Sequence, residues 1–165
     1  RSGRFFSILT SVQTKNMSQT FADFAEARQA RNDIQLKIVE HALTLCDKLK
    51  EDYIAYSIRS IKANKHKDSA HWSDWSQNRL TRLEKNECDM EFILDSSGRK
   101  YHKIQQRDGA HGSVHCFIDK RTGEVYKAAS WKAPAKIVRY NLLSISSREE
   151  CFSRADWCGH YLYLK

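Results

Sequence analysis

The spacing of apolar positions changes near Met90 and divides the chain into two halves. Before this point, apolar residues recur at steps of three and four, as on one face of an α-helix. After it, apolar and polar residues alternate with a period of two, as in half-buried β-strands. The pattern predicts a helical half, residues 17–88, and a strand half, residues 90–165. Thr20 and Asp23 resemble a capping box at the start of the helical half.

Two helices, residues 20–31 and 33–63, are expected in the first half. Asn32 and Asp33 can cap the start of the second helix. One helix over the whole stretch would also be long for a chain of this size. The apolar register of the second helix comprises Leu36, Val39, Leu43, Cys46, Leu49, Tyr53 and Tyr56.

A third, shorter helix is expected after a polar loop at residues 66–73, and it should end near Glu87. Trp72 and Trp75 lie three residues apart and so share one face of this helix. We expect them to anchor the helix against the sheet. A base-stacking or ligand-binding role is the alternative.

Six segments of the second half have the alternation of β-strands. They are residues 91–95, 100–107, 113–119, 124–130, 137–143 and 160–164. Residues 119–124 begin with polar side chains and place Gly123 where a tight hairpin needs a positive φ. A serine-capped short helix, residues 146–156, is expected before the last strand.

The predicted fold class is α+β, with N-terminal helices packed on one face of a mostly antiparallel meander sheet of about five or six strands. Short connections between successive strands favour antiparallel neighbours, and the second face of such a sheet can remain accessible. Residues 17–165 are expected to form a single α+β domain. Residues 1–16 contain no acidic side chain and precede Met17. We interpret them as a leader or upstream translation outside the fold.

The charge of the chain is concentrated in the strand half. The 165 residues include 28 Lys and Arg against 20 Asp and Glu, for a net charge of +8. Between Ser96 and Arg139 there are ten basic side chains and three acidic ones, so this segment has a net charge of +7 (10 − 3). Five aromatic residues are interleaved with these cations: Tyr101, Phe117, Tyr126, Trp131 and Tyr140.

Cations beside flat rings are typical of surfaces that bind single-stranded nucleic acid, because cations neutralise phosphates and rings stack on bases. The loop at residues 131–136 is expected to gather such groups at one edge of the sheet. The candidate nucleic-acid-binding residues are Lys127, Trp131, Lys132, Lys136, Arg139 and Tyr140. Strand alternation places Tyr126 and Lys127 on opposite faces, which argues against a single shared face. The alternative is that the rings belong to the core and the lysines are merely solvated.

No pattern in the sequence indicates catalysis, a metal site or a cofactor. The five cysteines form no CxxC pair and are expected to be reduced thiols of a cytoplasmic protein. The spacing of His111 and His115 matches no standard zinc pattern. His115 and Cys116 are adjacent on a strand and face opposite ways, so they make a poor catalytic pair. No apolar run approaches the roughly 20 residues that a membrane span needs.

Residues 113–142 and 154–163 resemble segments of small uncharacterised proteins encoded by marine bacteriophages. The resemblance implies a phage gene product acting in the bacterial cytoplasm. That group has no assigned activity, so the resemblance implies no functional residues.

The sequence therefore predicts a non-enzymatic protein that binds single-stranded nucleic acid through a basic and aromatic sheet edge. One alternative is a protein-interaction or structural module, such as a homo-oligomer formed through the helix at residues 33–63. An enzyme with a scattered site is the third alternative.

Overall fold

The computed structural model describes residues 20–64 and 74–164. The expected leader at residues 1–16 and the whole of the expected loop at residues 66–73, which includes Trp72, lie outside these ranges. The chain divides into two compact units, residues 1–36 and residues 37–165. Each unit is described by itself, and the expectation of a single domain stays a prediction.

Helix α2 is continuous from Phe21 to Asn64, so the expected break between two helices is wrong. Its start is a capping box, in which the Thr20 and Asp23 side chains accept hydrogen bonds from each other's backbone N–H at 3.2 and 3.1 Å. At the expected break, the amide of Gln29 donates to Asp33 one turn later at 3.0 Å. Asp33 thus supports the helix from within, and the stretch has no glycine or proline to interrupt it.

The buried face of α2 is rotated from the expected one. Within residues 37–64 the buried positions include Ile38, Ala42, Leu45 and Leu49, spaced by four, three and four. Leu43 was expected on this face but is 49% exposed. The helix has two neighbouring rows of apolar side chains. The row that contains Ile38 and Leu45 is buried in the core, and Leu43 belongs to the other row.

Helix α3, Asp74–Glu84, follows the residues expected to form a loop and contacts α2. Arg79 donates a hydrogen bond to the Tyr53 hydroxyl on α2 at 3.4 Å. Trp75 is 65% exposed, and the Arg79 guanidinium lies 5.4 Å from its ring. Trp75 therefore does not anchor α3 against the sheet, contrary to the expectation.

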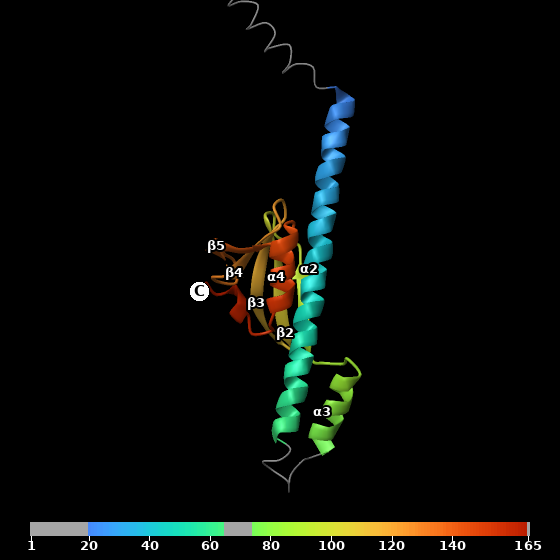
Figure 1. The fold of residues 1–165 in the computed structure, drawn as a ribbon, viewed down its shortest axis with the longest axis vertical. Coiled ribbons are helices and arrows are strands. Elements are labelled where there is room, and N and C mark those ends of the chain that lie inside the picture. Colours follow the sequence, from blue (N-terminus) through green and yellow to red (C-terminus); the bar gives the residue numbers. More distant parts are fainter. Residues whose placement is uncertain (1–19, 65–73, 165) are drawn as a thin grey trace, which may run out of the picture. The chain divides into compact units, whose positions relative to one another are not determined.

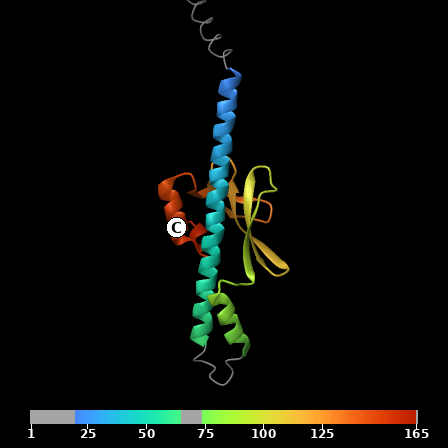
Figure 2. The same ribbon diagram turned by 90° about the vertical axis from the view of Figure 1, so that its right-hand side faces the viewer.

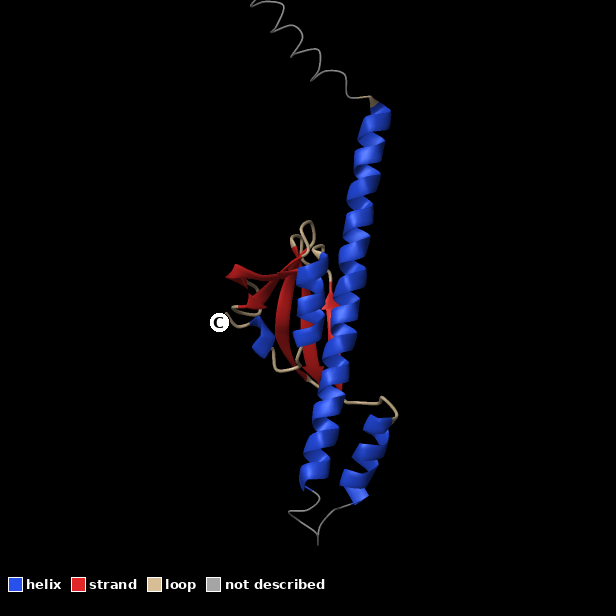
Figure 3. Ribbon diagram, viewed as in Figure 1, coloured by secondary structure: helices blue, strands red, loops and turns tan. Residues whose placement is uncertain are grey.

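The sheet is the predicted antiparallel meander, with strand order β1-β2-β3-β4-β5 (Figures 1 and 3). The strands are β1 (Met90–Asp95), β2 (Tyr101–Asp108), β3 (His111–Asp119), β4 (Glu124–Ala128) and β5 (Pro134–Asn141). Each strand pairs only with its neighbours in the sequence, which confirms the α+β fold class.

The expected last strand at residues 160–164 is wrong. After helix α4, Ile145–Arg154, the chain forms a short 3-10 helix, His160–Leu162. Tyr161 and Leu162 are buried in the core instead of pairing with a strand. Residues 161–164, Tyr-Leu-Tyr-Leu, have the alternation of a strand, but the first two of them lie in this 3-10 helix. Gly159 precedes the helix with a φ of 79°.

The core of residues 37–164 lies between the helices and one face of the sheet. It joins α2 and α4 to apolar side chains that alternate along the strands, among them Ile104, Cys116, Ile118 and Val125. Helix α4 lies beside this part of α2 in both views (Figures 1 and 2). The opposite face of the sheet, which we call the outer face, carries the other set of alternating side chains. Among the described residues, none of the helices has the length and apolarity that crossing a membrane requires.

The hairpin between β3 and β4 depends on Gly123. Its φ of 73° lies in the left-handed region, and a Cβ would lie 3.1 Å from Leu143 Cγ. We expect Gly123→Ala to lower the free energy of unfolding by about 2 kcal/mol, because strain and crowding add. Gly109→Ala is the control, because φ is 59° there and nothing lies within 4 Å of the added atom. Denaturant titration should show roughly half the loss for Gly109→Ala, and equal losses would contradict the crowding argument.

Candidate nucleic-acid interface

Strand alternation places a mixed set of rings and cations on the outer face. On β2, His102 and Ile104 are buried on the core side, so Tyr101 and Lys103 point the other way. Lys103 pairs with Phe117 of β3 across the strands, and Phe117 pairs in turn with Tyr126 of β4. The outer face therefore carries a row of aromatic side chains that runs across three strands.

These rings pack against one another. The Tyr101 ring centroid lies 5.9 Å from that of Phe117 and 5.9 Å from that of Tyr126, both edge to face. Phe117 is only 2% exposed, so it forms the floor of this face and offers no free ring surface. Trp131, in the loop before β5, is 47% exposed and is the ring on which a base can stack.

Lysine side chains lie over this row of rings. Lys103 Nζ is 4.8 Å from the Trp131 centroid and 5.6 Å from the Phe117 centroid. Lys100 Nζ is 5.3 Å from the Tyr101 centroid. Such cation–π contacts orient both partners, so Lys103 holds Trp131 beside the row of rings.

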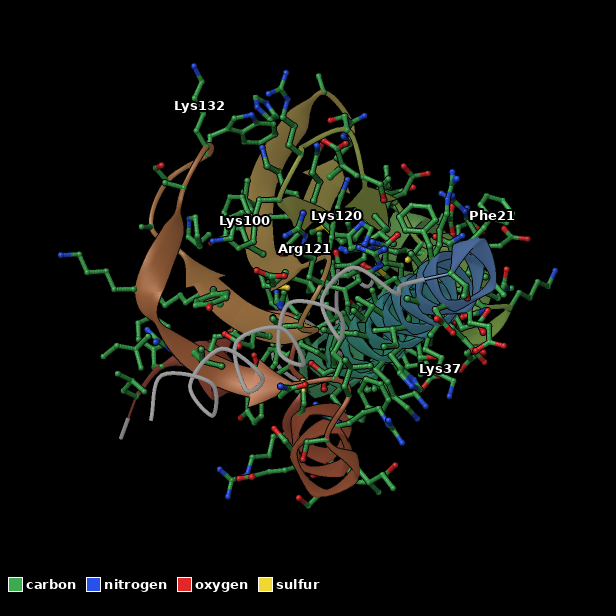
Figure 4. All side chains as sticks on the ribbon, turned by 90° about the horizontal axis from the view of Figure 1, so that it is seen from above. Phe21, Lys37, Lys100, Lys120, Arg121 and Lys132 are labelled. Atoms are coloured by element: carbon green, nitrogen blue, oxygen red, sulfur yellow. The ribbon has the colours of Figure 1, made fainter. Side chains whose placement is uncertain are left out.

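A cavity of about 230 Å³ adjoins these rings, and we call it the basic hollow. Its walls carry the cations Arg99, Lys100, Lys103 and Lys132 and one carboxylate, that of Asp95. Among the described residues, none of these four cations forms a salt bridge. Figure 4 shows Lys100 and Lys132 on the same side of the view, away from Lys37 and helix α4. The hollow therefore has a net positive charge that the protein leaves available for an anion.

Lys120 holds the turn that forms one wall of the basic hollow. Its Nζ donates to the backbone oxygen of Ser96 at 2.7 Å and to that of Gly98. Its backbone N–H also donates to Lys100 O at 3.0 Å. Lys120 thus fixes the turn at residues 96–100 and is not one of the available cations.

Asp95 is fixed by its own hydrogen bonds. One carboxylate oxygen accepts from the Ser97 backbone N–H at 2.9 Å, and the other accepts from Gln105 Nε2 at 2.9 Å. Arg107 donates twice to Gln105 Oε1, at 3.1 and 2.9 Å, and so fixes the orientation of the amide. Hydrogen bonds from Ser97 lower the pKa of Asp95, so the carboxylate is ionised at neutral pH.

The six residues predicted from the sequence do not form one site. Lys132 lines the basic hollow, and Trp131 lies beside it, next to Lys103. Lys136 is exposed on β5, and Lys127 lies 4.7 Å from the Tyr163 ring.

The other two predicted residues serve the fold. Arg139 Nε donates to Leu162 O at 2.6 Å and so ties β5 to the 3-10 helix. Tyr140 is only 7% exposed, and its hydroxyl donates to Tyr161 O at 2.9 Å. Tyr140 therefore belongs to the core, and the prediction that its ring stacks on a base is wrong.

Of the nine residues that line the basic hollow, eight were not among the candidates; they include Asp95 and also Arg99, Lys100, Tyr101 and Lys103. The alternation on β2 carried the signal for the last two, because Tyr101 and Lys103 have the parity opposite to Ile104. Their meeting with Trp131 depends on the path of the loop before β5, which alternation does not determine.

The histidines and cysteines considered for catalysis are separated or buried. His115 Nε2 and the Tyr161 hydroxyl form a hydrogen bond of 2.8 Å, whereas His111 is exposed. Burial raises the pKa of Cys46 and of Cys151 to about 12, and that of Cys116 well above its usual value. Within residues 20–64 and 74–164, no three His, Cys, Asp or Glu side chains are placed to hold a metal ion.

A family model matches residues 21–164, which include both helices of the N-terminal half, the whole sheet and the basic hollow. The chain belongs to the family of unknown function DUF7717. Neither a curated protein nor a solved structure matches it. The match to DUF7717 covers most of the chain but assigns no activity, so any function has to be argued from the outer face itself.

Proposed function

We propose that this chain binds single-stranded nucleic acid on the outer face of its sheet. The observation that carries the proposal is the exposed Trp131 ring, which Lys103 holds beside a hollow lined by four cations. Bases of a single strand can stack on such a ring, whereas the bases of a duplex are already stacked and paired. The proposed site is therefore the outer face, centred on β2 and the loop before β5, rather than the β5 edge.

In this mechanism the basic hollow holds the backbone of the strand and Trp131 holds a base. Lys100, Lys103 and Lys132 neutralise phosphates and release their condensed counterions. The hollow is smaller than the pockets of 300 Å³ and more that enclose whole small molecules. It therefore suits one sugar-phosphate unit of a longer strand.

Trp131→Ala is expected to weaken binding of a fluorescein-labelled oligothymidylate of about 15 nucleotides roughly tenfold, since one stacked base contributes about 1–3 kcal/mol. Fluorescence anisotropy at about 50 mM salt measures this, because the electrostatic part of binding is strong there. Trp75→Ala is a matched control, because Trp75 is also exposed and also lies next to an arginine or lysine. Equal effects of the two substitutions, or no binding by the unmodified protein, would contradict the proposal.

The phage origin, the cytoplasmic location and a homo-oligomer through residues 33–63 stay predictions. None of them is needed for the proposed binding mode.

A further inference from the structure

The basic hollow contains one group that does not suit a phosphate. Asp95 lies among four cations, and its ionised carboxylate repels the anion that these cations attract. It is an acceptor only. The Ser97 backbone, the Ser97 side chain and Gln105 all donate to it, which occupies three of its roughly four lone pairs and leaves one for a further donor. A ligand that offers a neutral donor beside its phosphate therefore fits the hollow better than one that offers the phosphate alone.

We propose that the basic hollow selects RNA over DNA, with Asp95 accepting a hydrogen bond from a ribose 2′-hydroxyl. This inference rests on the proposed binding of single-stranded nucleic acid. The 2′-hydroxyl is the group that distinguishes the two sugars, and it is next to the 3′ oxygen that carries the phosphate linking to the following nucleotide. A carboxylate and a cation that lie together on the wall thus match a 2′-hydroxyl and the adjacent 3′-phosphate.

The rigidity of Asp95 supports selection. Its carboxylate is fixed by Ser97 and Gln105, and Gln105 is in turn fixed by Arg107. A fixed acceptor gains a full hydrogen bond from a hydroxyl without first losing side-chain freedom. When the sugar is deoxyribose, the carboxylate keeps its repulsion of the phosphate and gains nothing in return, so DNA is disfavoured.

A base amino group is the competing donor. Uracil has no exocyclic amino group, and its N3–H donor is the same in oligouridylate and oligodeoxyuridylate, so a comparison of the two strands excludes the base as the cause. The probes are fluorescein-labelled oligouridylate, oligodeoxyuridylate and 2′-O-methyl oligouridylate, each of about 15 nucleotides. The 2′-O-methyl strand keeps the oxygen at the sugar but has lost the hydroxyl proton and gained a methyl group, whereas the deoxy strand lacks the hydroxyl without added bulk. Weaker binding of both strands therefore points to donation by the hydroxyl.

We expect the unmodified protein to bind oligouridylate about tenfold more tightly than either of the other strands, the usual effect of one hydrogen bond to a charged group. Asp95→Asn should remove most of this preference, and Asp95→Ala should remove it fully. Both variants should bind oligodeoxyuridylate as tightly as the unmodified protein or more tightly, because a repulsive charge is gone. A variant that is merely unfolded loses both ligands, so retained DNA binding reports that the fold is intact.

Glu91→Gln is the matched control. Glu91 is exposed on the same strand and the same face, and it is not part of the wall of the basic hollow. This variant has the same change of charge and should keep the tenfold preference. Equal affinity of the unmodified protein for RNA and DNA overturns the inference and leaves the proposed function standing. A preference that survives both Asp95 variants overturns the role of Asp95, and the absence of binding to every strand overturns the proposed function as well.

Discussion

Replacing Lys100, Lys103 and Lys132 together by glutamine is expected to lower the affinity for a single-stranded oligonucleotide roughly 500-fold at about 50 mM salt. Each phosphate contact on a single strand contributes about 0.7 to the slope of log affinity against log salt. Between 1 M and 50 mM salt this amounts to about eightfold for each contact, and three contacts multiply. All three lysines line the basic hollow without a salt bridge among the described residues, so their charge is available for this exchange.

Anisotropy titrations at several salt concentrations measure the effect, and the slope itself should fall by about 2. A control variant with Lys37, Lys48 and Lys85 replaced by glutamine has the same net charge and lacks exposed lysines that lie on α2 or just after α3. Its slope should stay close to that of the unmodified protein. If both variants lose affinity alike, binding depends on net charge alone and the outer face is not the site.

Acidification from pH 6.5 to pH 4 is expected to lower the free energy of unfolding by roughly 3 kcal/mol through His115 alone. Burial lowers the pKa of His115 to about 4, since the ring lies beneath the sheet against Tyr161 and Phe92. In the unfolded chain the same ring takes up a proton near pH 6.5. Between these two values the unfolded state binds more protons than the native state, so stability falls as the pH falls.

Urea titrations at pH 7 and pH 4 measure this loss in the unmodified protein and in His115→Gln. Burial also lowers the pKa of His102 and of His41, and these groups contribute equally to both proteins. The difference between the two losses therefore isolates His115 and should be roughly 3 kcal/mol. The same loss in both proteins would show that His115 accepts its proton without unfolding.

Elements whose formation depends on neighbouring residues could be predicted from the sequence. The hairpin around Gly123 and the capping box at Thr20 formed as expected because each depends on a few adjacent groups. The order of the meander followed from short connections. The break expected at Asp33 was wrong because the same side chain that can cap a helix can also bond within one.

The candidate site was harder to predict because it depends on contacts between distant segments. Tyr140 and Trp131 look alike in sequence, as an aromatic residue near basic ones, yet one is buried and the other exposed. The difference arises because the 3-10 helix at the end of the chain packs against Tyr140, and this segment had been expected to be a strand.

Residues 95–132 supply every wall of the basic hollow, and the same strands supply much of the core from their other side. Substitution at outward positions such as Lys103 leaves the side chains that pack beneath the helices in place. In the proposed binding mode, the side chains that contact the ligand can therefore change without loss of the fold. The proposed specificity of this chain thus depends on residues 95–132 and is separate from the packing that holds the fold together.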